Sequence, residues 1–324
     1  MRWIPSGRKL LAAACIAACA TAALAQAAWP NRPIKIVVGL PAGLSVDVFA
    51  RVYADKLSKA LGQPVVVENR AGASGNIAQD LVAKAAPDGN TLLYAVSSSF
   101  VTNPYVYKKL PFDVDKDFTP VAMTAINGLY LVVSNDFPAK TLPDLIKLVR
   151  ANPGKYSYAS YGVGGFPHLM MELILDQEKL EMVHVPYKGG ALTDVAGGSI
   201  PMVIEPPSTA IPLIRDGRVR ALAYLGTQRH PATPDVPLLS DSIPGTKDII
   251  GFHGVWAPAR TPREIVDRLN RELTQASKDP EVQERIRAAF ADPASSTPEQ
   301  MAAITRKEQA RWKSLIESRN IHLD

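Results

Sequence analysis

Cysteine is almost absent from this sequence of 324 residues. The two cysteines, Cys15 and Cys19, both lie near the N-terminus, in a segment that has the features of a removable leader. Once that segment is removed, the chain has no disulfide, no thiolate nucleophile and no cysteine ligand for a metal. Packing alone must then stabilise its core.

Signatures of catalysis are missing as well. The sequence has no GxSxG, Walker or HExxH motif, and the segment from Gly72 to Gly75 is one residue too short for a nucleophile elbow. The alternating acids Asp113, Asp115 and Asp117 lack the glycine and glutamate of a calcium loop. Metal-ligand spacing is also missing among the five histidines, which are His168, His184, His230, His253 and His322. We therefore expect no enzyme activity, no metal and no cofactor.

The chain carries little net charge. The formal net charge is +5, but Arg2, Arg8 and Lys9 belong to the leader, and the remaining 33 Lys and Arg against 31 Asp and Glu give +2. Lysine and arginine form no run that could follow a phosphate backbone. We expect no nucleic-acid partner.

The N-terminal apolar stretch, residues 10–18, is shorter than the roughly 20 residues of a membrane span. It follows the three basic residues and precedes Ala23-Leu24-Ala25, a small-x-small cleavage site. This pattern predicts a signal peptide, residues 1–25, and export to the periplasm. As an alternative, residues 16–19 fit a lipoprotein-type site at which Cys19 would carry the lipid.

Short apolar strands alternate with amphipathic helical patterns after the leader. The expected strands are residues 34–38, 64–68, 91–96, 129–134, 156–159, 182–185, 202–205 and 219–224. The expected helices are residues 46–61, ended by Gly62, and then 76–86, 143–151 and 167–177, with capping boxes at 261–264 and 297–300 before a helical tail. The βαβαβ order predicts a parallel sheet. The whole pattern predicts two α/β lobes, with residues 29–127 plus about 228–324 in lobe 1 and about 128–227 in lobe 2.

Three loops follow expected strands, where open α/β sheets bind ligands. The candidate residues are Ala42, Gly43, Leu44, Ser45 and Asp47 in the first, Ser97, Ser98 and Ser99 in the second, and Ser160, Gly162, Val163, Gly164, Gly165, Phe166 and His168 in the third. In the first loop Ser45 is the expected N-cap, and free helical N–H groups there would attract an anion. An ordinary βα loop, a polar serine loop and a packed His168 are the competing interpretations.

Several segments resemble the Bug, or TctC-like, family of periplasmic receptors for tripartite tricarboxylate transporters. The segments are WPNRPI (29–34), VVVENRAGA (65–73), PDG (87–89), KDFTPV (116–121), HVPYKG (184–189), RALA (220–223) and AP (257–258). The resemblance runs from Trp29 to the C-terminus. It implies a type II-like, Venus-flytrap fold in which loops of both lobes hold a ligand carboxylate through backbone amides and waters.

The chain departs from the family pattern at the loops that the resemblance assigns to the ligand. Ala42, Leu44 and Val46 occupy a loop that usually reads PPGG followed by polar residues. Gly165 and Phe166 stand where Thr and Ser are usual. Glu205, a further candidate ligand residue, replaces a common aspartate, and Phe252 a common tryptophan. These departures remove hydroxyl donors and add apolar surface, so we expect a carboxylate with a more apolar body than citrate, aromatic or alkyl.

The resemblance implies a monomeric receptor that delivers its ligand to a membrane permease. A sensory receptor that signals to a kinase and a periplasmic hydrolase using His168 or Glu205 are alternatives that the sequence leaves open.

Overall fold

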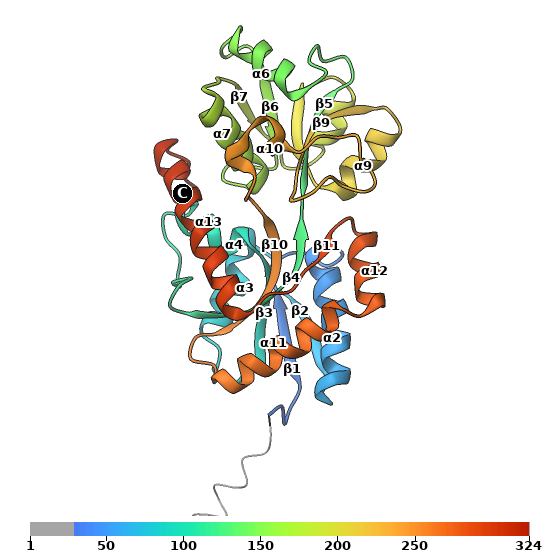
Figure 1. Ribbon diagram of the computed structural model, residues 1–324. Helices are drawn as coiled ribbons and strands as arrows, with labels where there is room; N and C mark the ends of the chain where they lie inside the picture. Colours follow the sequence, from blue (N-terminus) through green and yellow to red (C-terminus); the bar gives the residue numbers. More distant parts are fainter. Residues whose placement is uncertain (1–28, 324) are drawn as a thin grey trace, which may run out of the picture.

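The computed structural model describes residues 29–323 and shows two lobes stacked end to end (Figure 1). Each lobe is built around one sheet with helices packed against it. The chain builds most of the lower lobe in Figure 1, crosses into the upper lobe, and returns to complete the lower lobe. This arrangement confirms the expected two-lobed α/β fold. The expected signal peptide and the alternative lipid site at Cys19 lie outside the described residues.

The lower lobe holds a six-stranded sheet in the order β11-β4-β10-β3-β1-β2. Its strands are β1 (Ile34–Val38), β2 (Val65–Asn69), β3 (Thr91–Val96), β4 (Phe118–Asn127), β10 (Gly251–Pro258) and β11 (Asp292–Pro293). Its helices are α2 (Ser45–Leu61), η1 (Ala73–Gly75), α3 (Asn76–Ala83), α4 (Ser98–Val101), α5 (Asn103–Val106), α11 (Arg263–Ser277), α12 (Pro280–Ala288) and α13 (Pro298–Ser318). β1 pairs in parallel with β2 and β3, as the βαβαβ pattern predicted, whereas β10 runs antiparallel to β3 and β4.

The upper lobe holds a five-stranded sheet in the order β7-β6-β8-β5-β9. Its strands are β5 (Leu129–Ser134), β6 (Ser157–Ser160), β7 (Val183–Pro186), β8 (Met202–Glu205) and β9 (Val219–Leu225). Its helices are α6 (Leu142–Arg150), α7 (Phe166–Glu178), α8 (Ala191–Ala196), α9 (Pro207–Arg215), α10 (Leu239–Ser242) and η2 (Pro244–Thr246).

Local sequence explains why α2 begins and ends where it does. Its apolar face, which includes Phe49, Tyr53 and Leu57, is fully buried against the sheet. Gly62 ends the helix in the left-handed conformation, at φ 67°, and its N–H donates to the Ser58 carbonyl. A pattern of apolar residues followed by glycine therefore placed this helix correctly from sequence.

One of the two expected capping boxes forms and the other does not. At α13, the Thr297 hydroxyl accepts from the Gln300 N–H and the Gln300 side chain accepts from the Thr297 N–H, which confirms that box. At α11 the predicted capping box is wrong. Pro262 is the N-cap there, and the Thr261 hydroxyl donates to the Pro258 carbonyl at 2.7 Å instead.

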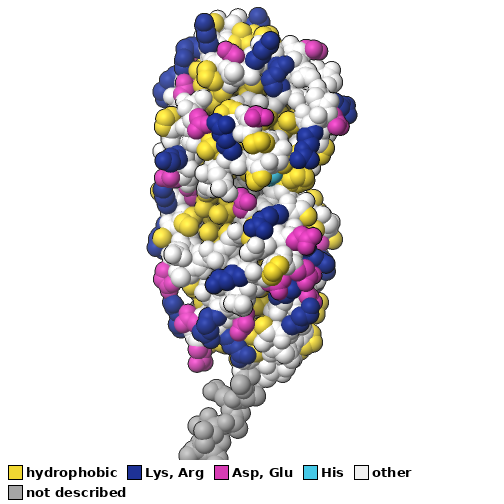
Figure 2. Space-filling view, turned by 45° about the vertical axis from the view of Figure 1, so that its right-hand side comes forward, with side chains coloured by type: hydrophobic (Ala, Val, Ile, Leu, Met, Phe, Trp, Pro, Cys, Tyr) yellow, Lys and Arg dark blue, Asp and Glu magenta, His cyan; other side chains and the backbone are white. Residues whose placement is uncertain are grey.

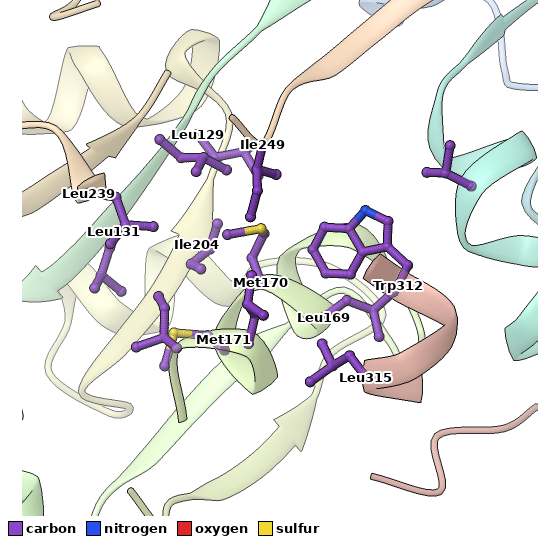
Figure 3. Packing of buried hydrophobic residues seen from close by; sticks show 14 of the residues in the cluster. Leu129, Leu131, Leu169, Met170, Met171, Ile204, Leu239, Ile249, Trp312 and Leu315 are labelled. Carbon is purple, nitrogen blue, oxygen red and sulfur yellow. The ribbon is translucent and has the colours of Figure 1, made fainter. Parts of the chain in front are cut away.

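The segment between β9 and β10 corrects the expected lobe boundary, which placed residues from about 228 onward in lobe 1. Its first part pairs with β9, since the Tyr224 N–H donates to the Pro237 carbonyl at 2.8 Å. Leu239 of α10 lines a small cavity together with Leu129, Met170 and Leu225 of the upper lobe, and Figure 3 shows Ile249 beside Leu129. Residues 228–250 thus belong to the upper lobe, because their apolar side chains complete its core.

Strand direction decides which loops meet at the junction of the lobes. The chain leaves the lower lobe at the end of β4 and returns at the start of β10, so those ends mark the junction. β10 begins antiparallel to the end of β3, with His253 opposite Val96, and β5 begins antiparallel to the end of β8, with Tyr130 opposite Glu205. The carboxyl ends of β1 and β3 in one lobe, and of β6 and β8 in the other, therefore face the same junction.

Gly128, between β4 and β5, is a position where any side chain should be costly. A Cβ built on Gly128 would lie 2.0 Å from the hydroxyl oxygen of Tyr224. We expect Gly128→Ala to lower the free energy of unfolding by about 1–3 kcal/mol, as measured by urea denaturation. Gly189→Ala is the matched control, since nothing lies within 4 Å of the position that its methyl group would take. Equal stability of the two variants would contradict the prediction.

Candidate ligand-binding site between the lobes

The first candidate loop lies exposed at the junction, after β1. Ala42, Gly43, Leu44 and Ser45 are all exposed. The expected cap at Ser45 is wrong, because Leu44 is the N-cap residue and provides no side-chain cap. Ser45 and Val46 are the first two helical residues, so their N–H groups have no acceptor one turn earlier.

Asp47, in the first turn of α2, fixes the conformation of this loop through hydrogen bonds. Its side chain is 3% exposed, and its carboxylate accepts from the Gly43 N–H at 2.9 Å, from Arg51 at 3.1 Å and from Asn69 at 3.0 Å. Burial works to raise the pKa of Asp47, but the hydrogen bonds from Arg51, Gly43 and Asn69 outweigh it and hold the pKa below its usual value. Asp47 therefore remains ionised and acts as a positioning residue for the exposed loop.

In the loop after β3, residues 97–99, two of the three serines are buried within the lower lobe. Ser97 is buried, and its N–H and hydroxyl both bond to the backbone of Phe252 on β10. Ser99 is also buried, beside a small cavity of about 10 Å³ that Gly39 and Gly75 help to line. Ser98 is the partly exposed member of the three.

The loop after β6 has several of its amides already bonded within the protein. The Gly162 N–H donates to the Ser160 hydroxyl at 3.2 Å, and the Gly164 N–H donates to Nδ1 of His168 at 3.1 Å. Gly165 is the N-cap of α7 and offers no side-chain cap. Phe166 begins the helix, so its N–H has no intrahelical acceptor, and Pro167 has no N–H at all.

The buried His168 stacks on the partly exposed His184 under this loop. Their ring centroids are 3.9 Å apart, and Nε2 of His184 lies 2.6 Å from the hydroxyl of Ser160. Burial, together with the neighbouring His184, lowers the pKa of His168 to about 3. The structure thus supports the packing interpretation of His168, which holds the loop from beneath.

Acid is expected to destabilise the fold through its buried histidines. Burial lowers the pKa of both His168 and His253 from 6.5 to about 3. Because the unfolded chain then binds protons first as the pH falls, the loss of stability due to these histidines should begin near pH 6.5 and be complete near pH 3. Each such histidine can contribute up to about 1.4 kcal/mol per pH unit in that window. Urea midpoints at pH 7.5 and pH 5 measure the effect.

Two variants separate buried histidine from exposed histidine in this experiment. His168→Gln keeps an acceptor for Gly164 and should reduce the difference between the two urea midpoints. His322→Gln, at an exposed position, should leave that difference unchanged. A wild-type midpoint that is the same at both pH values would contradict the prediction.

Glu205 lies at the end of β8, buried at 1% exposure. The hydroxyls of Tyr161 and Thr209 both donate to its carboxylate. Burial raises the pKa of Glu205, and the two hydroxyls only partly offset that effect. Tyr161, which sequence reasoning did not select, covers this carboxyl group and is itself 42% exposed.

Sequence reasoning also missed the loop between β2 and α3 as part of the junction. Four successive residues, Gly72, Ala73, Ser74 and Gly75, have positive φ values between 46° and 141°. The Gly75 N–H donates to the Gly72 carbonyl at 3.0 Å, which closes this loop as a tight turn. The available signal was a pair of glycines between an expected strand and an expected helix, at a carboxyl strand end.

The two lobes touch at this junction. A Cβ built on Gly164 of the upper lobe would lie 2.3 Å from Val106 Cγ1 of the lower lobe. The Phe166 ring meets Trp312 of α13 edge-on, at 5.4 Å between centroids. Figure 2 shows the outline of the molecule narrowing where the lobes meet, with hydrophobic side chains gathered there.

The structure therefore divides the predicted site residues into two layers. Those at the facing edges are Ala42, Gly43, Leu44, Ser45, Ser98, Gly162, Val163, Gly165 and Phe166. Those buried beneath are Asp47, Ser97, Ser99, Ser160, Gly164, His168 and Glu205. Between residues 29 and 323, no cluster of three or more His, Cys, Asp or Glu is placed to hold a metal ion. Within the same range, no helix has the length and apolar character needed to cross a bilayer.

Two α/β lobes are joined by the strands that cross between them, and glycine-containing loops of both lobes meet at the junction. This is the architecture of a two-lobed solute-binding protein. The family model for the tripartite tricarboxylate transporter family receptor matches residues 49–321. A UPF0065 protein from the tcbD–tcbE intergenic region of Pseudomonas sp. strain P51 is 38% identical over 315 residues, covering 95% of this chain and 93% of that protein. This chain belongs to the tripartite tricarboxylate transporter receptor family, whose members are binding proteins and not enzymes.

Solved structures give the same result. The structure of R. palustris Rpa4515 with adipate has a TM-score of 0.77 at 33% identity, covering 91% of this chain and 100% of that one. MatC (Rpa3494) from Rhodopseudomonas palustris, with bound malate, has a TM-score of 0.73 at 29% identity, covering 89% of this chain and 100% of that one. The resemblance found in the sequence is therefore confirmed.

Proposed function

We propose that this protein captures a small organic carboxylate between its lobes in the periplasm and delivers it to a tripartite tricarboxylate-type membrane permease. The observation that carries the proposal is that α2, α3 and α7 all begin at the junction without a side-chain cap. By contrast, the side chains of Thr141, Asp279 and Thr297 cap α6, α12 and α13, while α11 also begins without a side-chain cap. Uncapped N–H groups and the helix dipole favour a bound anion.

The anion would be held mainly by main-chain groups. Ser45 and Val46 of the lower lobe and Phe166 of the upper lobe supply N–H groups at helix starts, and Ser98 supplies a hydroxyl. Hydrogen bonds to a carboxylate are about twice as strong as neutral ones. Solved relatives with adipate and malate support a carboxylate as the ligand class.

The body of the ligand would be more apolar than citrate. Leu44 is 48% exposed next to the start of α2, and Val163 and Tyr161 border the facing loop. Phe166, although partly buried against Trp312, adds apolar surface to the same loop. An aromatic or alkyl carboxylate would cover these groups on lobe closure, and burial of apolar area stabilises the complex by roughly 25 cal/mol per Å².

A thermal-shift screen of the purified protein against citrate, malate, adipate and benzoate tests both parts of this proposal. A ligand at about 100 times its Kd should add about 2.7 kcal/mol to stability. We expect adipate or benzoate to raise the Tm more than citrate does. Stabilisation by citrate or malate alone would refute the apolar ligand body. A flat response to every organic acid would refute the receptor function.

Delivery to a permease is tested by uptake. Membrane vesicles that contain a co-expressed tripartite permease should accumulate the labelled ligand only when this protein is added. Uptake that is independent of the protein would contradict delivery while leaving ligand capture intact. We expect the protein to act as a monomer, cleaved after Ala25, and mass determination of the periplasmic form checks both points.

A further inference from the structure

A second cavity lies in the lower lobe, between α13 and the chain segment of residues 105–118. Its volume is about 540 Å³, within the range of about 300–1,000 Å³ that small-molecule sites occupy. Phe100, Phe118 and Trp256 form its buried floor, at 1%, 6% and 2% exposure, whereas Tyr105, Val114 and Pro120 are the partly exposed apolar residues that line it. None of its lining residues belongs to the loops at the lobe junction described above.

Hydrogen bonds between the two walls of this cavity fix the distance between them. Nε2 of Gln309 on α13 donates to the Phe100 carbonyl at 3.2 Å and to Oδ1 of Asp115 at 2.9 Å. The segment is fixed at its far end, where the Ala259 N–H donates to the Asp117 carbonyl at 2.8 Å. It is also fixed at its near end, where the Leu323 N–H donates to the Val106 carbonyl at 2.8 Å.

The side chains of α13 leave this space unfilled. Ala302 and Ala310 stand eight residues apart on the face that lines the cavity, and Thr305 between them turns its hydroxyl back to the Met301 carbonyl. The small residues of α13 and the fixed position of residues 105–118 opposite it leave a cavity that is already formed without a ligand.

The side chain of Arg306 gives this cavity a positive charge that no other described residue pairs with. Arg306 lines the cavity and is exposed, and among residues 29–323 no hydrogen bond or ion pair engages its guanidinium group. Its neighbour Lys307 instead pairs with Asp248 at 2.9 Å. Oδ1 of Asp115 on the opposite wall accepts from Gln309, so Arg306 is the positively charged group available to a ligand.

We propose that this cavity is a second small-molecule site, separate from the lobe junction, that takes a flat apolar anion. An aromatic ring would lie against the partly exposed side chains of Tyr105, Val114 and Pro120, and an acidic group would pair with the Arg306 guanidinium. A guanidinium group forms planar, bidentate hydrogen bonds with carboxylate or sulfonate-type oxygens and stacks on aromatic faces, which suits such a ligand.

The test uses 8-anilinonaphthalene-1-sulfonate, a fluorescent aromatic sulfonate, with the folded wild-type protein at neutral pH. We expect saturable binding with a stoichiometry of one per chain at this cavity. Arg306→Gln should weaken binding about tenfold, a change of about 1.4 kcal/mol. Ala302→Phe, which fills the cavity, should abolish it, and Ala310→Phe provides a second block if the first variant does not fold.

Two controls separate this site from the surface and from the lobe junction. Lys307→Gln removes an equal charge one residue away and should leave dye binding unchanged. Gly164→Ala, at the lobe junction, should also leave it unchanged. The proposal is overturned if the dye binds equally well to Arg306→Gln and to the two phenylalanine variants, or if Gly164→Ala alone removes the signal.

Discussion

Replacing Gly164 with alanine is expected to weaken carboxylate binding at least tenfold. Gly164 has φ +73°, which costs an alanine about 1–2 kcal/mol, and the added methyl group would meet Val106 Cγ1 at 2.3 Å. Because Gly164 and Val106 belong to different lobes, this collision opposes the approach of the lobes around a ligand. Isothermal titration with the best ligand from the thermal-shift screen measures the loss.

Two further variants isolate the cause. Gly165→Ala changes the neighbouring glycine, which has φ −63° and a nearest contact of 3.4 Å, and should bind nearly as well as wild type. Gly164→Ala combined with Val106→Ala removes the colliding methyl groups and should recover part of the lost affinity. Wild-type binding by Gly164→Ala, or no recovery in the double variant, would contradict the steric explanation.

Removing the Asp47 carboxylate should cause the second large effect. Asp47→Ala leaves the Gly43 N–H, the Arg51 guanidinium and an Asn69 N–H without their acceptor. We expect the free energy of unfolding to fall by about 1–3 kcal/mol, together with a loss of ligand affinity as the loop before α2 loses its anchor. Urea denaturation and ligand titration of the same variant measure the two effects.

Asp55→Ala is the matched control for this substitution. Asp55 lies on the same helix, is exposed, and pairs with Lys59 one turn away at 2.8 Å. Removal of an exposed pair of this kind changes stability by about 0.5 kcal/mol or less. If Asp47→Ala proves no more harmful than Asp55→Ala, the assignment of Asp47 as the positioning residue is wrong.

Patterns that depend on neighbours in sequence were predicted well. The strands β1, β3, β5 and β8 have the expected bounds, since each is a short apolar run between turn residues. The predicted cap at Ser45 is wrong because the helix begins one residue earlier, with the Leu44 carbonyl accepting from the Asp47 and Val48 N–H groups. The expected lobe boundary failed because residues 228–250 have no strand pattern of their own, and the packing of Leu239 against Leu129 and Leu225 is what shows which core they complete.

The sequence by itself determined the alternation of strands and helices, the absence of catalytic motifs and the family to which the chain belongs. These follow from local periodicity and from residue identities in order, which folding does not alter. Only the tertiary structure decided which loop residues face the junction and which, such as Ser160 and His168, hold the loops from beneath. Burial and hydrogen-bond partners are set by residues far away in the chain, and no local pattern contains that information.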